Sequence, residues 1–235
     1  MGQVLKEKSL QDDNNAAGKL SASDRVAEAI LQDIRSGRLV PGQHLLEPEL
    51  TGRLGISRGS LREALKHLAA AGIVDLNRFR GAYIAALDRK AVLDLLDTLE
   101  PLARLAARLA ARHCTSDKAA QPLVKSASVL EDLRVSGQRG DYLNERRRFY
   151  DIMVEMGGNM ELARAMPLSR TDLFRAQVEN RQSEPQRRRH AEGYTKIAEA
   201  VKARDESAAD KAMADHFAGT RQTMAELPAE VFPSA

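Results

Sequence analysis

The sequence predicts a mainly α-helical protein, with a small N-terminal domain of three helices and a β-hairpin followed by a longer domain made of helices alone. Aromatic residues make up only 4% of the 235 residues and Trp is absent, a composition that favours helices over sandwiches or barrels. Apolar residues recur at helical spacing along most of the chain. Hairpin signals occur in one stretch, at residues 73–85.

The composition excludes several classes of protein. An apolar content of 43% can bury a core, which argues against a disordered chain. The single cysteine, Cys114, excludes an intramolecular disulfide framework and a cysteine-rich zinc site. No apolar run approaches the ~20 residues of a membrane span, and residues 1–20 lack the apolar stretch of a signal peptide. We therefore expect a cytoplasmic protein without membrane partners.

Charge alone does not identify a partner, because the formal net charge is only +3. Any basic surface for nucleic acid must be local. Residues 1–20 are polar and aperiodic, which predicts a disordered arm. Residues 21–87 form the predicted N-terminal domain. Its expected elements are a helix capped by Ser23 and closed by Gly37, helices 47–54 and 58–71, and strands 73–76 and 82–85.

Helices 47–54 and 58–71 are separated by a tight turn at residues 55–57, which is the arrangement of a DNA-binding helix-turn-helix. Arg suits bidentate contact with guanine and also binds phosphate, while Ser can reach a base edge or the backbone and Gly allows close approach. The residues predicted to face the major groove are Ser57, Arg58, Gly59, Ser60 and Arg62.

The hairpin would add a wing beside the helices. Arg78 and Arg80, followed by Gly81, lie at its tip, where guanidinium groups are attracted to a narrow minor groove. The alternative for each Arg is an ordinary solvated side chain. Their joint placement at a turn and a hairpin tip favours DNA contact.

A second hypothesis for the turn is catalytic, because residues 55–59 match the G-x-S-x-G pattern of a nucleophile elbow. That elbow requires a strand before the serine, and here a helix is predicted. A hydrolase using Ser57 is therefore kept only as an alternative, beside a DNA-binding protein that has no effector.

Residues 88–228 are predicted to form an all-helical bundle for effector binding and dimerisation, with residues 229–235 as a tail. The short breaks between helices predict antiparallel packing. No HExxH, glycine-rich phosphate loop or CxxC pattern occurs, which favours binding over catalysis. The six expected helices are 89–113, 116–136, 140–156, 160–180, 184–204 and 206–225.

Several motifs resemble a known family. Residues 34–42, 46–50 and 54–65 are similar to the winged helix-turn-helix of GntR-type bacterial regulators, and residues 79–84 resemble its wing. The helical half resembles the ligand-sensing FCD domain of the FadR branch, in its shorter VanR-like form. The resemblance implies a homodimeric repressor that binds a palindromic operator and is released by a small carboxylate. Pro48 departs from the family, which commonly has Arg there for DNA contact.

The resemblance also implies a divalent metal held by an Asp and three His, but the chain departs from this pattern. Arg146, Tyr150 and Tyr194 stand at the first three positions, and only His216 remains. Arg is a permanent cation and offers no lone pair. His190, one turn before Tyr194, could substitute as a ligand but would lack a carboxylate partner. The sequence therefore predicts no metal and no other cofactor.

The same departure suggests an effector site. Arg146 could pair directly with a carboxylate, while Tyr150, Tyr194 and His216 donate hydrogen bonds. Leu96 stands where the family often has an Arg, and Arg146 would take over the role of that residue. Two Tyr suggest that the small acid could be aromatic. The alternative is that residues 146–148 are a solvated charge run and that the Tyr residues are ordinary core.

Overall fold

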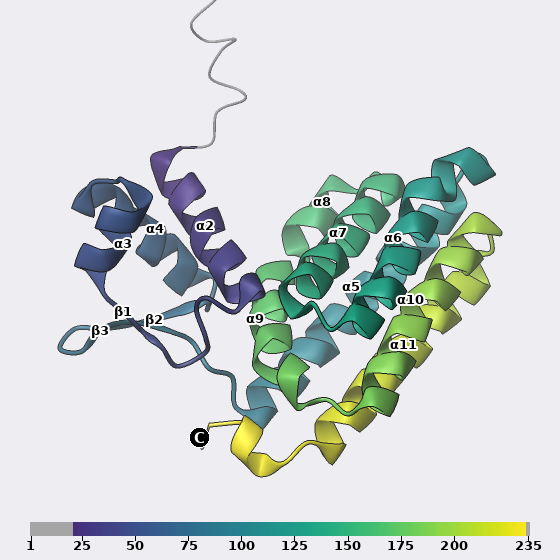
Figure 1. The fold of residues 1–235 in the computed structure, drawn as a ribbon. Helices are drawn as coiled ribbons and strands as arrows, with labels where there is room; N and C mark the ends of the chain where they lie inside the picture. Colours follow the sequence, from purple (N-terminus) through teal and green to yellow (C-terminus); the bar gives the residue numbers. More distant parts are fainter. Residues whose placement is uncertain (1–20, 234–235) are drawn as a thin grey trace, which may run out of the picture.

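The computed structural model describes residues 21–233 (Figure 1). The predicted arm, 1–20, lies outside this range. The N-terminal domain has three helices and a three-stranded antiparallel sheet of order β1–β3–β2. Its elements are α2 (Ala22–Ser36), β1 (His44–Leu45), α3 (Glu47–Leu54), α4 (Arg58–Ala70), β2 (Val74–Asn77) and β3 (Gly81–Ile84).

The bounds of α4, β2 and β3 differ from the predicted 58–71, 73–76 and 82–85 by one residue, and two further details of this domain differ from the prediction. The cap of α2 is Ser21, not Ser23, because Asp24 completes a reciprocal capping box with Ser21. The strand β1 was not predicted, since two residues are too short to show an alternating pattern. It pairs with β3 through His44 and Tyr83, and the predicted hairpin pairs Val74 with Ile84.

The C-terminal domain is an all-helical bundle, as predicted. α5 packs against α7 and α11, and α10 packs against α6 and α11. Within residues 21–233 the domain has seven α-helices, whose bounds are α5 (Arg89–His113), α6 (Asp117–Ser136), α7 (Arg139–Gly157), α8 (Met160–Ala165), α9 (Leu168–Val178), α10 (Glu184–Lys202) and α11 (Glu206–Glu226).

The expectation of six helices was wrong because the predicted helix 160–180 is interrupted. Pro167 lacks a backbone amide and disfavours helical geometry in the residue before it. Met166 accordingly adopts an extended conformation, and the chain restarts as α9, followed by the short 3₁₀ segment η1 (Glu179–Arg181).

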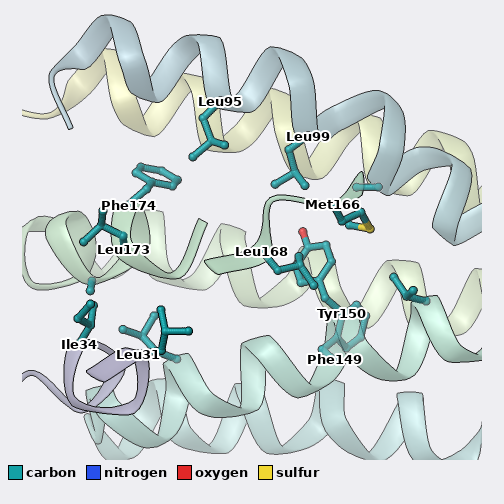
Figure 2. Close-up of a cluster of buried hydrophobic side chains, with 14 of the residues drawn as sticks. Leu31, Ile34, Leu95, Leu99, Phe149, Tyr150, Met166, Leu168, Leu173 and Phe174 are labelled. Atoms are coloured by element: carbon teal, nitrogen blue, oxygen red, sulfur yellow. The ribbon is translucent and has the colours of Figure 1, made fainter. Parts of the chain in front are cut away.

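α9 lies between the two domains, against α2 on one side and α5 and α7 on the other. In Figure 2, Leu173 points toward Leu31 and Ile34 of α2, while Phe174 points toward Leu95 of α5. One continuous apolar core therefore joins the domains through this helix.

The connection after β3 is also fastened to α9. The side-chain amide of Gln177 donates to the Leu87 carbonyl at 2.8 Å and to the Val231 carbonyl at 3.0 Å, and the Leu87 amide donates to the Gln177 side chain at 2.9 Å. The predicted tail, 229–235, is structured as far as it is described. It contains η2 (Ala229–Val231), and Phe232 is buried beneath the Arg89 guanidinium, 4.5 Å from its ring centroid.

Candidate functional site

The first turn of α4 presents the predicted DNA-contacting residues together. Arg58, Gly59 and Arg62 are exposed at this end of the helix. Ser57 is the N-cap, and its hydroxyl accepts from the Ser60 amide at 3.1 Å. The Ser57 and Ser60 hydroxyls lie 3.0 Å apart. The cap therefore fixes how α4 begins, while the two Arg residues remain available to a partner.

Arg62 and Glu47 form a weak surface contact, with Arg62 Nε 3.4 Å from Glu47 Oε2. Both side chains are exposed, at 65% and 36%, and such pairs contribute about 0–1 kcal/mol. Phosphate could replace the carboxylate at little cost. Pro48 is exposed in the first turn of α3, so the position that departs from the family pattern offers no charged group.

The nucleophile-elbow hypothesis requires a strand before Ser57. Instead Ser57 follows helix α3 and the left-handed turn at Gly55, whose φ is +63°. Its hydroxyl is used to cap α4. The local geometry is therefore that of a helix-turn-helix.

The turn at the tip of the wing is closed by the Asn77 side chain. Asn77 Oδ1 accepts from the amides of Phe79 and Arg80 at 2.9 and 3.1 Å. Gly81 has φ +88°, and a side chain there would meet His44, whose Nε2 is 2.9 Å from the Cβ position. Arg78, Phe79 and Arg80 are exposed around this braced turn.

The residues predicted to bind an effector converge in the middle of the helical domain, and all of them are buried. They come from four helices: Leu96 from α5, Arg146 and Tyr150 from α7, His190 and Tyr194 from α10, and His216 from α11. All but Tyr194 line a small cavity. The Tyr194 ring lies 5.0 Å from the His190 ring and 4.7 Å from the His216 ring, measured between centroids.

This cavity has an open volume of only about 10 Å³, roughly the space of one water molecule. A ligand larger than water therefore requires the lining side chains to move. A surface groove of about 200 Å³ between α10 and α11 shares His190 and His216 with the cavity. The two imidazoles thus lie between the buried site and this groove.

Sequence reasoning missed two charged residues of the site, Arg175 and Asp172 of α9. The Arg175 side chain is 2% exposed, with Nη2 2.9 Å from His190 Nδ1. Because a guanidinium can only donate, His190 Nδ1 is the acceptor, and the neutral ring carries its proton on Nε2. The Tyr142 hydroxyl lies 3.0 Å from the same nitrogen.

Asp172 is the ionic centre of this region. Its carboxylate accepts from Arg146 Nη1 at 3.2 Å, Arg147 Nη1 at 2.9 Å and Arg35 Nη1 at 3.3 Å. Burial raises the pKa of Asp172, while the guanidiniums of Arg146, Arg147 and Arg35 act in the opposite direction. With three cations around it, we assign Asp172 as ionised.

The hypothesis of a solvated charge run fits only part of residues 146–148. Exposure of the side chains rises from 3% at Arg146 through 27% at Arg147 to 61% at Arg148. Arg148 points to solvent beside Glu145, whereas Arg146 is held inside the domain by Asp172.

Burial controls the protonation of the other polar groups. Burial, with the nearby charges of Arg175 and Arg146, lowers the pKa of His216 to about 3. Burial, Arg175 and His216 hold the pKa of His190 well below its ordinary value. Burial also raises the pKa of Tyr194. At neutral pH the site therefore contains neutral imidazoles and a protonated phenol beside two guanidiniums.

Four buried polar atoms here have no hydrogen-bond partner within residues 21–233. They are Arg146 Nε, Arg175 Nε, Tyr194 Oη and His216 Nδ1. Buried polar groups are nearly always paired in proteins, so such a cluster requires an explanation. The two Nε atoms and the phenol are hydrogen-bond donors, which suits a ligand rich in acceptors, such as an anion.

The same residues do not fit a divalent metal. His190 already uses its Nδ1 lone pair to accept from Arg175, the phenols are protonated, and the Asp172 carboxylate is engaged by three Arg. Throughout the described range, no group of three His, Cys, Asp or Glu is placed to hold a metal ion. Two permanent cations would also repel one.

Close packing of His216 gives a first test of this site. At Gly193 an added Cβ would lie 2.2 Å from His216 Nδ1. We expect Gly193→Ala to lower the free energy of unfolding by about 1–3 kcal/mol, because the clash outweighs the gain of up to about 1 kcal/mol from Ala in a helix. Urea titration followed by circular dichroism measures it.

Gly219→Ala is the matched control on α11. Its added Cβ would lie 3.4 Å from the flexible side chain of Arg189, so stability should stay unchanged or rise by up to about 1 kcal/mol. Equal effects of the two variants would show that His216 does not pack closely on α10.

Comparison with known proteins adds independent findings. Residues 22–84 match the model of the bacterial regulatory proteins of the gntR family, and residues 91–219 match the FCD domain. The chain is 25% identical over 200 residues to the probable D-xylose utilization operon transcriptional repressor of Paenarthrobacter nicotinovorans, covering 85% of this chain and 87% of that one.

Two further similarities cover most of the chain. Identity to the galactonate operon transcriptional repressor of Escherichia coli K12 is 22% over 226 residues, covering 88% of this chain and 99% of that one. The solved structure of E. coli McbR/YncC has a TM-score of 0.78 at 18% identity, covering 88% of this chain and 99% of that one. At this identity the structural match shows a shared fold.

No helix among residues 21–233 combines the length and apolar character that crossing a membrane requires.

Proposed function

The chain belongs to the GntR family of bacterial regulatory proteins and carries an FCD domain as its helical half, and on that premise we propose that it is a ligand-responsive transcriptional repressor. The N-terminal domain would bind operator DNA, and a small carboxylate in the buried site would release it. The observation that carries the ligand site is the cluster of four unpartnered buried polar atoms at Arg146, Arg175, Tyr194 and His216.

The proposed DNA contacts come from the N-terminal domain. Ser57, Arg58, Gly59, Ser60 and Arg62 would face the major groove, and Arg78, Arg80 and Gly81 would approach the backbone and minor groove. A homodimer would place two α4 helices about one helical turn of DNA apart on a palindromic operator in the cytoplasm. The names of two relatives, repressors of a xylose and a galactonate operon, support repression.

The effector class follows from the chemistry of the site. Two guanidiniums and a phenol offer donors to a carboxylate. Thr171 and Thr220 line the cavity. Their hydroxyls donate to the carbonyls of Pro167 and His216, which leaves each oxygen able to accept a further hydrogen bond. We propose a small hydroxy acid or aromatic acid, entering by the α10–α11 groove once His190 and His216 turn aside.

α9 provides a physical route from this site to the DNA-reading domain. Arg175 lines the cavity. One turn earlier, Asp172 binds both Arg146 of the site and Arg35 of α2. Arg35 is itself fixed by Asn144 Oδ1 at 2.9 Å and Glu28 Oε1 at 2.6 Å.

A carboxylate ligand would compete with Asp172 for Arg146. Once Arg146 turns to the ligand, the pairing of Asp172 with Arg35 and the seating of α2 on α9 would change together. The ligand would then favour one position of the N-terminal domain over another. The size of this shift is set by the difference between the ligand's affinities for the two positions.

Two measurements test this function. A duplex selected by the wild-type protein from a randomised pool gives the DNA probe, and a thermal-shift screen of hydroxy acids, aldonates and aromatic acids gives the ligand, because a ligand of the folded state raises the melting temperature. Arg58→Ala should weaken binding of the selected duplex about tenfold or more, since a lost bidentate contact costs about 1–3 kcal/mol. Tyr194→Phe should keep that affinity and weaken the response to ligand.

Arg35→Gln tests the route between the two sites. This variant should still bind the ligand, but the ligand should change its DNA affinity less than in the wild type. A protein that selects a duplex but shifts with no acid would be a DNA-binding protein without effector. Ester hydrolysis lost in Ser57→Ala would instead support the hydrolase alternative. Failure to select any duplex would reject the repressor.

A further inference from the structure

Phe79 is unlike the other phenylalanines of the chain. The sequence has five, and Phe149, Phe174, Phe217 and Phe232 are between 0% and 7% exposed, whereas Phe79 is 92% exposed. Burying a Phe side chain usually stabilises a protein through the hydrophobic effect. This ring is therefore held where it contributes nothing to the fold.

The wing fixes the position of this ring. Asn77 Oδ1 accepts from the Phe79 amide at 2.9 Å and from the Arg80 amide at 3.1 Å, which closes the turn on both sides of the residue. At its base, His44 fills the space above Gly81 and stacks on Tyr83 with ring centroids 4.7 Å apart. A braced turn presents Phe79 with little backbone entropy left to lose on binding.

The charges around the ring identify the kind of partner. Arg78 and Arg80 flank Phe79 and are exposed, and within the described residues neither guanidinium forms an ion pair. An apolar ring between two free cations suits a polyanion that also offers apolar surface. Duplex DNA does so in its minor groove, where phosphates border sugars and base edges, and apolar side chains are used there as wedges.

We propose that Phe79 contacts DNA directly, with its ring in the minor groove against sugar or base and Arg78 and Arg80 on the flanking phosphates. The inference rests on the proposed repressor function and deepens it. The wing then contributes an apolar contact as well as an electrostatic one, and an apolar wedge favours base steps that open easily, so Phe79 would influence which operators are chosen.

Salt dependence separates the two kinds of contact. On a duplex selected by the wild-type protein, Phe79→Ala should weaken binding about tenfold without changing the slope of log affinity against log salt, because no phosphate contact is lost. Arg78→Ala should weaken binding and reduce that slope by about 1. Phe79→Leu should retain most of the affinity. The Phe79 variants should fold normally, since the exposed ring is not part of the core.

Met160→Ala is the control, because Met160 is also exposed, at 66%, but lies on α8 in the helical domain. It should leave DNA affinity unchanged. If the wild type selects a duplex and Phe79→Ala binds it equally well, the inference is overturned. It is also overturned if Phe79→Ala changes the sedimentation mass of the free protein, because the ring would then contact a second copy. If the wild type selects no duplex, the proposed function itself fails.

Discussion

Asp172→Asn is expected to lower the free energy of unfolding by about 3–5 kcal/mol, the usual cost of removing one partner from a buried ionic cluster. The Asp172 side chain is 2% exposed and faces Arg35 and Arg146, which are 6% and 3% exposed. Asn fills the same space but cannot balance the guanidinium charges left behind. For a chain of this size the melting temperature should fall by roughly 6–20 °C.

Asp151→Asn is the matched control, because Asp151 also pairs with Arg147, at 3.1 Å, but is 55% exposed. Surface pairs of this kind contribute less than about 1 kcal/mol. Removing a cation should also restore part of the loss, so Arg146→Met is expected to be less harmful in the Asp172→Asn background than in the wild type. Equal destabilisation by the Asp151 and Asp172 variants would contradict the assignment of Asp172 as the ionic centre.

Local signals account for most of the fold. The bounds predicted for α3 and α5 agree with the structure, because Pro48 and the Asp88 cap mark where these helices begin. Ambiguous local signals led to wrong element boundaries. Ser21 and Ser23 are both plausible caps, and only the pairing with Asp24 decides between them. The break at Pro167 comes from the chemistry of proline, which the spacing of apolar residues over 160–180 does not show.

The sequence predicted only those residues of the candidate site that stand at positions of a family motif or beside them. Arg146, Tyr150, Tyr194 and His216 were found by their alignment with a family pattern, and the fold brings them together with His190. Asp172 and Arg175 belong to no motif. Their importance comes from contacts with α2, α7 and α10, and no local pattern encodes such contacts. The one available signal was a helix carrying charges among Leu173, Phe174 and Val178, with no polar face to hold them.

A strong acid dependence of stability is the second large effect that the site predicts. The pKa of His216 is lowered to about 3 by burial and by the charges of Arg175 and Arg146, and the pKa of His190 is also held well below its ordinary value. In the unfolded chain both should titrate near about 6.5. The unfolded state therefore binds more protons below that pH, and stability is complete above it and falls as the pH falls.

Each imidazole can contribute up to about 1.4 kcal/mol per pH unit, so the pair should cost about 3 kcal/mol between pH 7.5 and 5.5. The cationic and phenolic neighbours of the two imidazoles do not titrate in this range. Arg146 and Arg175 stay charged, and burial raises the pKa values of Tyr142 and Tyr194. Urea titration at the two pH values measures the difference.

The double variant His190→Gln/His216→Gln should lose most of this dependence, whatever its stability at pH 7.5, whereas His67→Gln, on the exposed face of α4, should retain it. If the double variant is as sensitive to acid as the wild type, the protons are taken up elsewhere and the imidazoles are not buried as neutral groups. A second pair of cations between α10 and α11 would add to the repulsion from Arg146 and Arg175, which is why protonation of the two imidazoles should weaken the packing of these helices.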